Sequence, residues 1–274
     1  MEKTRINELE KIAAEVRKDI VRMAGLARSG PIELPLLISD ILVYLYWEEM
    51  LLLAGSPARG DRDRFVLGME DGVPALYAVL ARRGYYEREQ LWHYMRLGSM
   101  LQALPDFRRT PGVDAPLVTS GTELSIASGL AYSLRKEGLR SRVFCFLEEK
   151  ECLGPDFMLE AEMCAKCGLD NITVIAVCKD KRGSGCSGSP RESRDPLKKC
   201  GWDIFDADGN DFASMEKVFA EAGCERGKPA AVYAKVSNGR GLSFAGEDAA
   251  KTKIIMSMEA MDRALEELEG KTNG

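Results

Sequence analysis

Two spacings of apolar residues alternate along the chain, and this alternation predicts an α/β protein. From Ile6 to Met23, apolar residues recur every three to four positions, which predicts a helix that stops at Gly30–Pro31. A second helix is expected from about Ile38 to Leu53. Because it is apolar nearly all round, it should be buried on more than one face and could form a subunit interface.

Short apolar runs of strand length alternate with helical patterns through the rest of the chain. The expected strands are Phe65–Leu67, Val143–Leu147, Ile172–Cys178, Trp202–Ala207 and Ala230–Lys235. The other expected helices are Pro74–Arg83, Glu87–Leu97, Leu124–Glu137, Asp156–Cys167 and a C-terminal helix that includes Ile254 and Leu268. This order implies a mainly parallel sheet flanked by helices. We expect one domain over residues 1–274, with a helical N-terminal segment at about 1–55 and the C-terminal helix at about 251–270.

Composition narrows the class of partner. The net charge is −5 and 30% of residues are charged, with no run of Lys and Arg, which argues against a nucleic-acid surface. The N-terminus does not read as a signal peptide, so we expect a cytoplasmic protein. The most apolar window, Leu34–Leu53, is interrupted by Asp40, Glu48 and Glu49, which favours a buried helix over a membrane span.

The most informative segment runs from Val143 to Lys179. Its first apolar strand leads directly into Glu148, Glu149 and Lys150, and a helix and a second strand follow. Ligands of open α/β sheets bind at the carboxyl ends of strands, so this order predicts a ligand site. The turn nevertheless lacks the glycines that such a site usually needs.

The cysteines are concentrated in the second half of the chain. They are Cys145, Cys152, Cys164, Cys167, Cys178, Cys186, Cys200 and Cys224. We expect them to be reduced. Cys164 and Cys167 have a metal-ligand or redox spacing, but the same spacing on a helix also places two small apolar side chains on one face. The Gly/Ser-rich piece Arg182–Ser189 reads as a mobile loop.

Many short motifs resemble, in order and spacing, the diphosphate-binding N-terminal half of transketolase. They are Arg62–Leu67, Pro74–Leu80, Leu97–Ser99, Leu101–Gln102, Pro105–Asp106, Thr110–Val113, Gly168–Asn171, Gly201–Trp202, Asp208–Asp211, Lys228–Pro229 and Lys235–Phe244. The resemblance covers the chain from about Val16 to Phe244. It implies the thiamine-diphosphate-binding fold, and the length is similar to that of the free-standing N-terminal subunit of a split transketolase.

The resemblance also implies where thiamine diphosphate and Mg²⁺ would bind. The family's Gly-Asp-Gly turn, whose aspartate holds the metal, aligns with Glu148-Glu149-Lys150, which makes Glu149 the candidate metal ligand. The family's second metal ligand, an asparagine, aligns with Lys179, and an ammonium group has no lone pair with which to ligate a cation. The family's Gly-x-Leu-Gly-Gln-Gly run, which touches the cofactor, aligns with Val118–Glu123 and retains only Gly121.

The family's histidines, which serve proton transfer and sugar binding, are absent as well. Their positions align with Pro31, Asp71, Leu104 and Asn210. The chain's only histidine is His93, which lies on a predicted helix outside these motifs and reads as an ordinary, partly buried residue.

Three functions therefore remain open. The first is a repurposed or pseudoenzyme subunit that assembles with itself and with a C-terminal-type partner. The second is the active half of a thiamine-diphosphate-dependent transketolase-type enzyme with an altered site, in which Lys150 and Lys179 neutralise the diphosphate or Glu149 still holds a metal. The third is an unrelated metal or redox site built from cysteine and acidic residues. The family's active site lies between two kinds of domain, so the resemblance also implies an obligate assembly, with a homodimer expected.

Overall fold

The fold consists of two compact units, each built from segments that are distant in sequence. The computed structural model describes residues 1–53, 55–56, 59–117, 121–180, 190–223, 227–237 and 256–272. The helical unit comprises Met1–Glu49, Glu70–Val113 and Ser237–Gly274, and the sheet unit comprises Met50–Met69 and Asp114–Val236. The single domain expected from the sequence stays a prediction.

The sheet unit is built on five strands in the order β1-β2-β3-β5-β4. The strands are β1 (Arg64–Leu67), β2 (Val143–Glu148), β3 (Ile172–Asp180), β4 (Asp203–Asp208) and β5 (Ala230–Ser237). The β1–β2, β2–β3 and β4–β5 pairs are parallel, with Phe65 opposite Phe144 and Cys145 opposite Val174. The predicted α/β class with a mainly parallel sheet is therefore confirmed.

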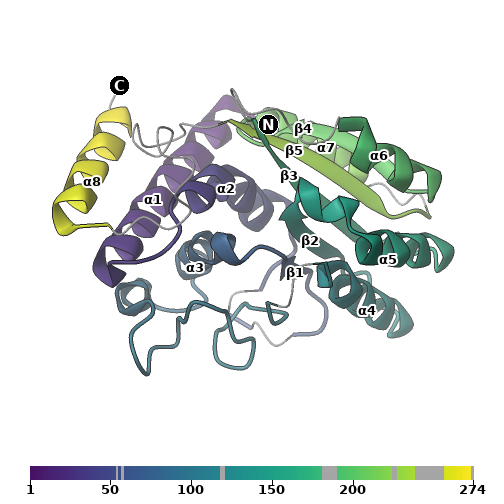
Figure 1. Ribbon diagram of the computed structural model, residues 1–274, viewed down its shortest axis with the longest axis horizontal. Coiled ribbons are helices and arrows are strands. Elements are labelled where there is room, and N and C mark those ends of the chain that lie inside the picture. Colours follow the sequence, from purple (N-terminus) through teal and green to yellow (C-terminus); the bar gives the residue numbers. More distant parts are fainter. Residues whose placement is uncertain are drawn as a thin grey trace. The chain divides into compact units, whose positions relative to one another are not determined.

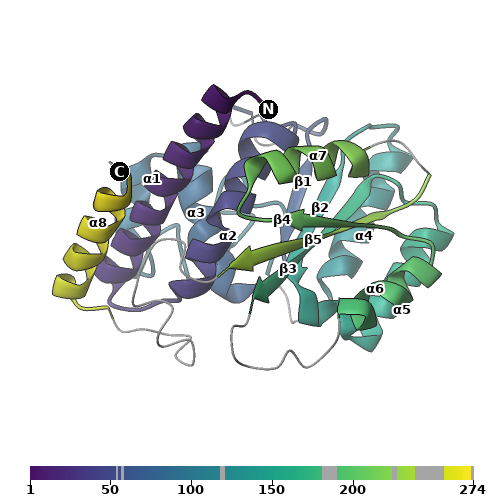
Figure 2. The same ribbon diagram turned by 90° about the horizontal axis from the view of Figure 1, so that it is seen from above.

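The direction of the connections decides which face of the sheet each helix covers. Parallel strands connected through a helix cross over in a right-handed sense. The chain moves across the sheet in one direction from β1 to β4, which places α4 (Glu123–Lys136), α5 (Pro155–Lys166) and α6 (Pro190–Lys199) on one face. The return from β4 to β5 reverses the direction, so α7 (Phe212–Ala222) lies on the other face (Figure 2).

A buried apolar core fills the space between the sheet and these first three helices. Alternate residues of β2, namely Val143, Cys145 and Leu147, all belong to this core, as period-two alternation of a strand requires. Phe157 of α5 is fully buried there. The Ala161 carbonyl of the same helix accepts a 2.8 Å hydrogen bond from the indole N–H of Trp202.

The helical unit packs around α1 (Lys3–Ala27). Its other helices are α2 (Glu33–Tyr44), which continues as a π-helical turn over Leu45–Glu49, α3 (Val73–Arg82) and α8 (Met258–Thr272). Helix α8 lies along α1 (Figure 1), where Gly25 faces Met261. Two buried carboxylates tie the unit together: Asp40 of α2 pairs with Arg17 of α1, and Asp19 of α1 pairs with Arg82 of α3.

Most expected elements are confirmed within two residues of their predicted ends, but the first helix extends over Lys3–Ala27 and the C-terminal helix begins at Met258 rather than at about residue 251. The second helix covers Glu33–Glu49 rather than Ile38–Leu53. The helix predicted at Glu87–Leu97 is wrong: a 3₁₀ turn at Arg88–His93 gives way to a loop in which Met95 has a left-handed φ of 60°. Helices α6 and α7 were not predicted.

Two further expectations concern single segments. Asp40, which interrupts the apolar window Leu34–Leu53, is an interior residue of its helix with a buried ion pair. The expected Gly/Ser-rich loop lies outside the described residues. None of the helices in the described ranges has the length and hydropathy that a bilayer crossing requires.

Candidate functional site

The carboxyl ends of β2 and β3 bring together three of the residues that the sequence marked as a ligand site. Glu148 pairs in register with Val177, so Lys179 follows two residues later on the adjacent strand. The Lys179 ammonium lies 3.5 Å from one carboxylate oxygen of Glu148, and the Lys150 ammonium lies 3.4 Å from the other. Lys179 is 27% exposed and Glu148 is 24% exposed, so this ion pair is only partly open to solvent. The site is therefore internally charge-paired.

Glu149 faces a thiol. It begins a 3₁₀ turn, Glu149–Leu153, that leads into α5. Burial raises the pKa of the Cys178 thiol, and the Glu149 charge together with a hydrogen bond between the two side chains raises it further. A thiol with a raised pKa is neutral at pH 7 and donates to the carboxylate. The candidate metal ligand is thus engaged by a neutral group on β3.

A buried acid lies at the amino end of α4. The Glu123 side chain accepts a 2.8 Å hydrogen bond from the Gly121 backbone N–H, and its residue is only 1% exposed. Its stem packs against the end of β1, because a Cβ added at Gly68 would lie 2.5 Å from the Glu123 Cγ. Burial raises the pKa of this carboxyl, and the bonds to backbone N–H groups only partly oppose the effect. The positive end of a helix dipole, which in other proteins receives phosphate groups, here receives the chain's own carboxylate.

The local charge does not suit a magnesium diphosphate. The carboxylates of Glu148, Glu149 and Glu151 are clustered with two lysines, Lys150 and Lys179, and the buried acid at the start of α4 adds a fourth carboxylate. A lysine stands where a metal would need an oxygen ligand. Throughout the described ranges there is no group of three or more His, Cys, Asp or Glu residues arranged to hold a metal ion. The residues present therefore do not fit the cofactor and its metal as the family binds them.

Comparison with known proteins assigns the chain to a family. The family model described as the thiamine diphosphate binding domain of transketolase matches residues 10–257. The chain belongs to this transketolase N-terminal family.

The relatives include proteins named as transketolase subunits. The chain is 27% identical over 265 residues to the 6-deoxy-6-sulfo-D-fructose transketolase subunit SqwG of Clostridium sp. (strain MSTE9), with 96% of each chain covered. It is 28% identical over 270 residues to an apulose-4-phosphate transketolase subunit of Actinobacillus succinogenes, again with 96% of each covered. It matches human transketolase-like protein 2 at 27% identity over 244 residues, which are 86% of this chain and 38% of that protein.

Solved structures agree on the fold. Transketolase from Campylobacter jejuni superposes with a TM-score of 0.84 at 20% identity, over 98% of this chain and 43% of that one. The transketolase complex with sedoheptulose 7-phosphate from Pichia stipitis gives 0.86 at 20% identity, over 97% and 41%. The chain therefore spans about two fifths of the length of these transketolases.

The four family histidine positions lie in different units. Pro31, Asp71 and Leu104 belong to the helical unit, and Asn210 belongs to the sheet unit. Leu104 is 51% exposed, whereas Asn210 is buried and its backbone N–H donates to the Asp208 carboxylate at 2.9 Å. None of these four positions carries an imidazole, so no histidine side chain is available there for the proton transfer that the family's histidines perform.

His93 differs from its prediction. It was expected to be partly buried on a helix, but it is exposed at the end of a 3₁₀ turn. It lines a pocket in the helical unit together with Arg96 and Arg109. No periodic signal in the sequence marks this pocket, since the surrounding loop has no regular repeat.

The six cysteines within the described part of the chain form no cluster of metal ligands. Cys145 is buried and the pKa of its thiol is raised, which makes it unreactive, and burial raises the pKa of Cys164 to about 12. Cys167 is exposed while Cys164 is buried, so the two thiols do not share the predicted face. Cys186 and Cys224 lie outside the described residues.

One charged motif that links the chain to the family, Arg62–Leu67, has a structural role. Arg62 donates to both oxygens of Asp114, at 3.1 and 2.5 Å, and the same carboxylate accepts the backbone N–H of Phe65 at 2.9 Å. Asp63 binds the Arg142 guanidinium at 2.9 Å. These bonds fix the start of β1 beside β2. This structural role accounts for the charged motif, and no catalytic role is needed to explain it.

Proposed function

We propose that this chain is a repurposed N-terminal subunit of a split transketolase-type assembly, one that keeps the fold and the assembly role but does not hold thiamine diphosphate and Mg²⁺ in the family manner. The observation that supports this most directly is the ion pair between Lys179 and Glu148. Lys179 stands at the family's metal-ligand position.

The electrostatics of this ion pair oppose a metal. Mg²⁺ requires oxygen ligands in near-octahedral geometry, and an ammonium group offers only N–H donors and a like charge. The Lys179 charge is balanced by Glu148. The pair thus neutralises part of the site without any external ion.

The helix end that faces this region is also engaged. The Glu123 carboxylate accepts a hydrogen bond from the Gly121 N–H and lies at the positive end of α4. A diphosphate at that end would meet a like charge in a place of low dielectric, where repulsion is strong. Both halves of the family's cofactor site, the metal and the anion cradle, are therefore replaced by side chains of this chain.

The assembly role rests on the relatives. Those that match over 96% of both chains are named as transketolase subunits, and the chain spans only about two fifths of the full-length enzymes. We propose a self-associating subunit, in the form of a dimer, that pairs with a C-terminal-type subunit. Size-exclusion chromatography with light scattering tests the dimer, and a monomer at about 50 μM, well above the Kd of a stable dimer, would refute it.

A second candidate function is supported by the same relatives. Their names attach sugar transketolase activities to subunits of this length, on 6-deoxy-6-sulfo-D-fructose and on apulose 4-phosphate. Lys150, whose side chain is 67% exposed, could meet a diphosphate as a point charge. An active half with an altered site is therefore the alternative.

Calorimetry distinguishes the two. Thiamine diphosphate with Mg²⁺ is titrated into the wild type, into the double variant Lys179→Asn/Glu123→Gly, which restores family residues, and into the control Lys166→Asn. Lys166 is an exposed lysine on α5 that pairs with Glu162. We expect no saturable heat for the wild type and the control at about 1 mM cofactor, and saturable binding for the double variant. Saturable binding to the wild type that the control retains would refute the repurposed subunit.

A further inference from the structure

A pocket in the helical unit lies outside the site described above. It is formed by the 3₁₀ turn after α3 and the loop that follows, and it has a volume of about 650 Å³. Its lining residues are Gln90, His93, Arg96, Leu97, Gly98, Ser99, Met100 and Arg109. The lining contains two guanidinium groups and no carboxylate, so the pocket is a place of positive potential.

Hydrogen bonds within the loop hold the lining residues in place. The Ser99 backbone N–H donates to the Arg96 carbonyl at 3.0 Å, which closes a tight turn. The Thr110 hydroxyl donates to the Met100 carbonyl at 3.3 Å, and this bond fixes the backbone next to Arg109. Thr110 itself is fully buried. Both arginines therefore extend from an ordered backbone, so a ligand need not order the loop to bind.

Neither arginine at the pocket pairs with an acid within the described ranges, in contrast to several other arginines of the same unit. In the helical unit Arg82 and Arg88 bond to Asp19, and Arg17 pairs with Asp40. By contrast, no carboxylate of the described residues pairs with either guanidinium at the pocket.

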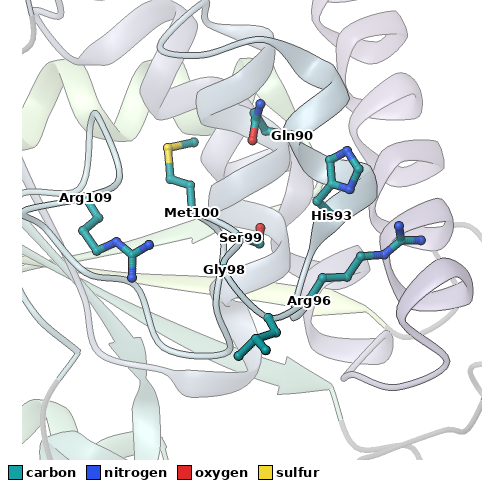
Figure 3. Close-up of a pocket in the computed structure, with 8 residues that line it drawn as sticks. Gln90, His93, Arg96, Gly98, Ser99, Met100 and Arg109 are labelled. Carbon is teal, nitrogen blue, oxygen red and sulfur yellow. The ribbon is translucent and has the colours of Figure 1, made fainter.

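The pocket surrounds a short backbone segment. Figure 3 shows Gly98 and Ser99 between Arg109 on one side and His93 with Arg96 on the other. The two guanidinium groups thus lie on opposite sides of one backbone segment, with the imidazole on the side of Arg96. Guanidinium groups bind phosphate oxygens through paired hydrogen bonds, and the imidazole and hydroxyl add further donors.

We propose that this pocket binds a small organic phosphate, of sugar-phosphate size, at a site separate from the ends of β2 and β3. The volume lies in the range of pockets that enclose small molecules. The exposed Leu97 on the rim provides apolar contact for the organic part of the ligand. This binding is independent of whether thiamine diphosphate binds to the sheet unit.

The chain offers a specific reporter for the test. His93 is the only histidine of the protein, so the imidazole signals in an NMR spectrum come from this pocket alone. Inorganic phosphate, glucose 6-phosphate and glucose are titrated at constant pH and ionic strength. We expect saturable shifts of the His93 signals with both phosphates, tighter for glucose 6-phosphate, and none with glucose.

Variants separate a built site from a generally positive surface. Arg96→Gln and Arg109→Gln should each weaken glucose 6-phosphate binding by about tenfold or more, because a hydrogen bond to a charged group is worth about 1.5–3 kcal/mol. Arg108→Gln is the matched control, since Arg108 is 78% exposed, lies next in sequence and does not line the pocket. It should bind as the wild type does. An absence of shift at about 50 mM phosphate, or equal weakening by the Arg108 and Arg109 variants, would overturn the proposal.

Discussion

Removing the charge of Asp40 should destabilise the protein more than removing that of Asp19, although both carboxylates are buried in ion pairs. The side chain of Asp40 is 2% exposed and that of its partner Arg17 is 9% exposed. In Asp40→Asn the Arg17 guanidinium would stay buried without its counter-charge. Breaking a buried pair in this way costs about 3–5 kcal/mol.

Asp19 is a different case because its partners can reach other groups. Its side chain is 0% exposed and accepts from Arg82 at 2.6 Å and from Arg88 at 2.5 Å. Arg88 is 38% exposed and can turn to water, and Arg82 keeps a contact with Glu15 at 3.1 Å. Asp19→Asn should therefore cost about 1.5–3 kcal/mol, the value of a lost hydrogen bond to a charged group.

Urea denaturation followed by circular dichroism measures both free energies of unfolding, provided that the slope with urea stays constant. The control is Asp61→Asn, since Asp61 pairs with Arg59 at the surface and should give no measurable change. Two results would refute this reasoning. One is an equal loss of unfolding free energy in Asp19→Asn and Asp40→Asn, and the other is a loss below about 1 kcal/mol in Asp40→Asn. Either would mean that burial of the partner arginine does not determine the loss.

Three further predictions concern Glu123, Gly25 and the thiols. Because burial raises the Glu123 pKa above its ordinary value of 4.5, the wild type should lose stability relative to Glu123→Gln as pH rises through the raised pKa, and the difference should vanish below pH 4.5. Urea denaturation of both proteins between about pH 4 and 8 measures this difference. A difference that stays constant with pH would contradict the prediction. Gly25→Ala should cost about 1–3 kcal/mol, because the new Cβ would lie 2.8 Å from the Cβ of Met261, and a cycle with Met261→Ala should show positive coupling rather than additivity. Iodoacetamide should alkylate exposed Cys167 well before Cys164, whose pKa is raised to about 12. Peptide mass spectrometry measures the two alkylation rates. Equal rates would contradict the prediction and would mean that the buried helix face opens in solution.

The strands could be predicted because each is a short apolar run with a clear end. The run that ends at Leu147 predicted β2, and a parallel sheet necessarily places the ends of adjacent strands together, so the proximity of Glu148 and Lys179 followed from topology. Helix α6 was not predicted because its segment is mostly polar, with Leu197 as its one large apolar residue, and includes Pro196. Helix α7 has an amphipathic pattern and a cap at Asp211 that could have been found.

The rest of the candidate site could not be read from spacing. Glu123 lies against Gly68, more than fifty residues earlier in the chain, and no local pattern encodes that approach. The bond between Glu149 and Cys178 likewise depends on which way two side chains turn at the ends of neighbouring strands. The helix predicted at Glu87–Leu97 was wrong for a simpler reason. The prediction rested on apolar spacing, which gives no sign of the left-handed backbone at Met95.

The Glu123 carboxylate at the start of α4 belongs to the same chain as its hydrogen-bond donor, the Gly121 N–H just before the helix. A covalently attached group acts at an effective concentration of millimolar or higher, which does not fall when the solution is diluted. Any free anion that approaches this helix end must therefore displace a competitor that is always present. The stability of the folded subunit should accordingly be the same whether such anions are scarce or abundant.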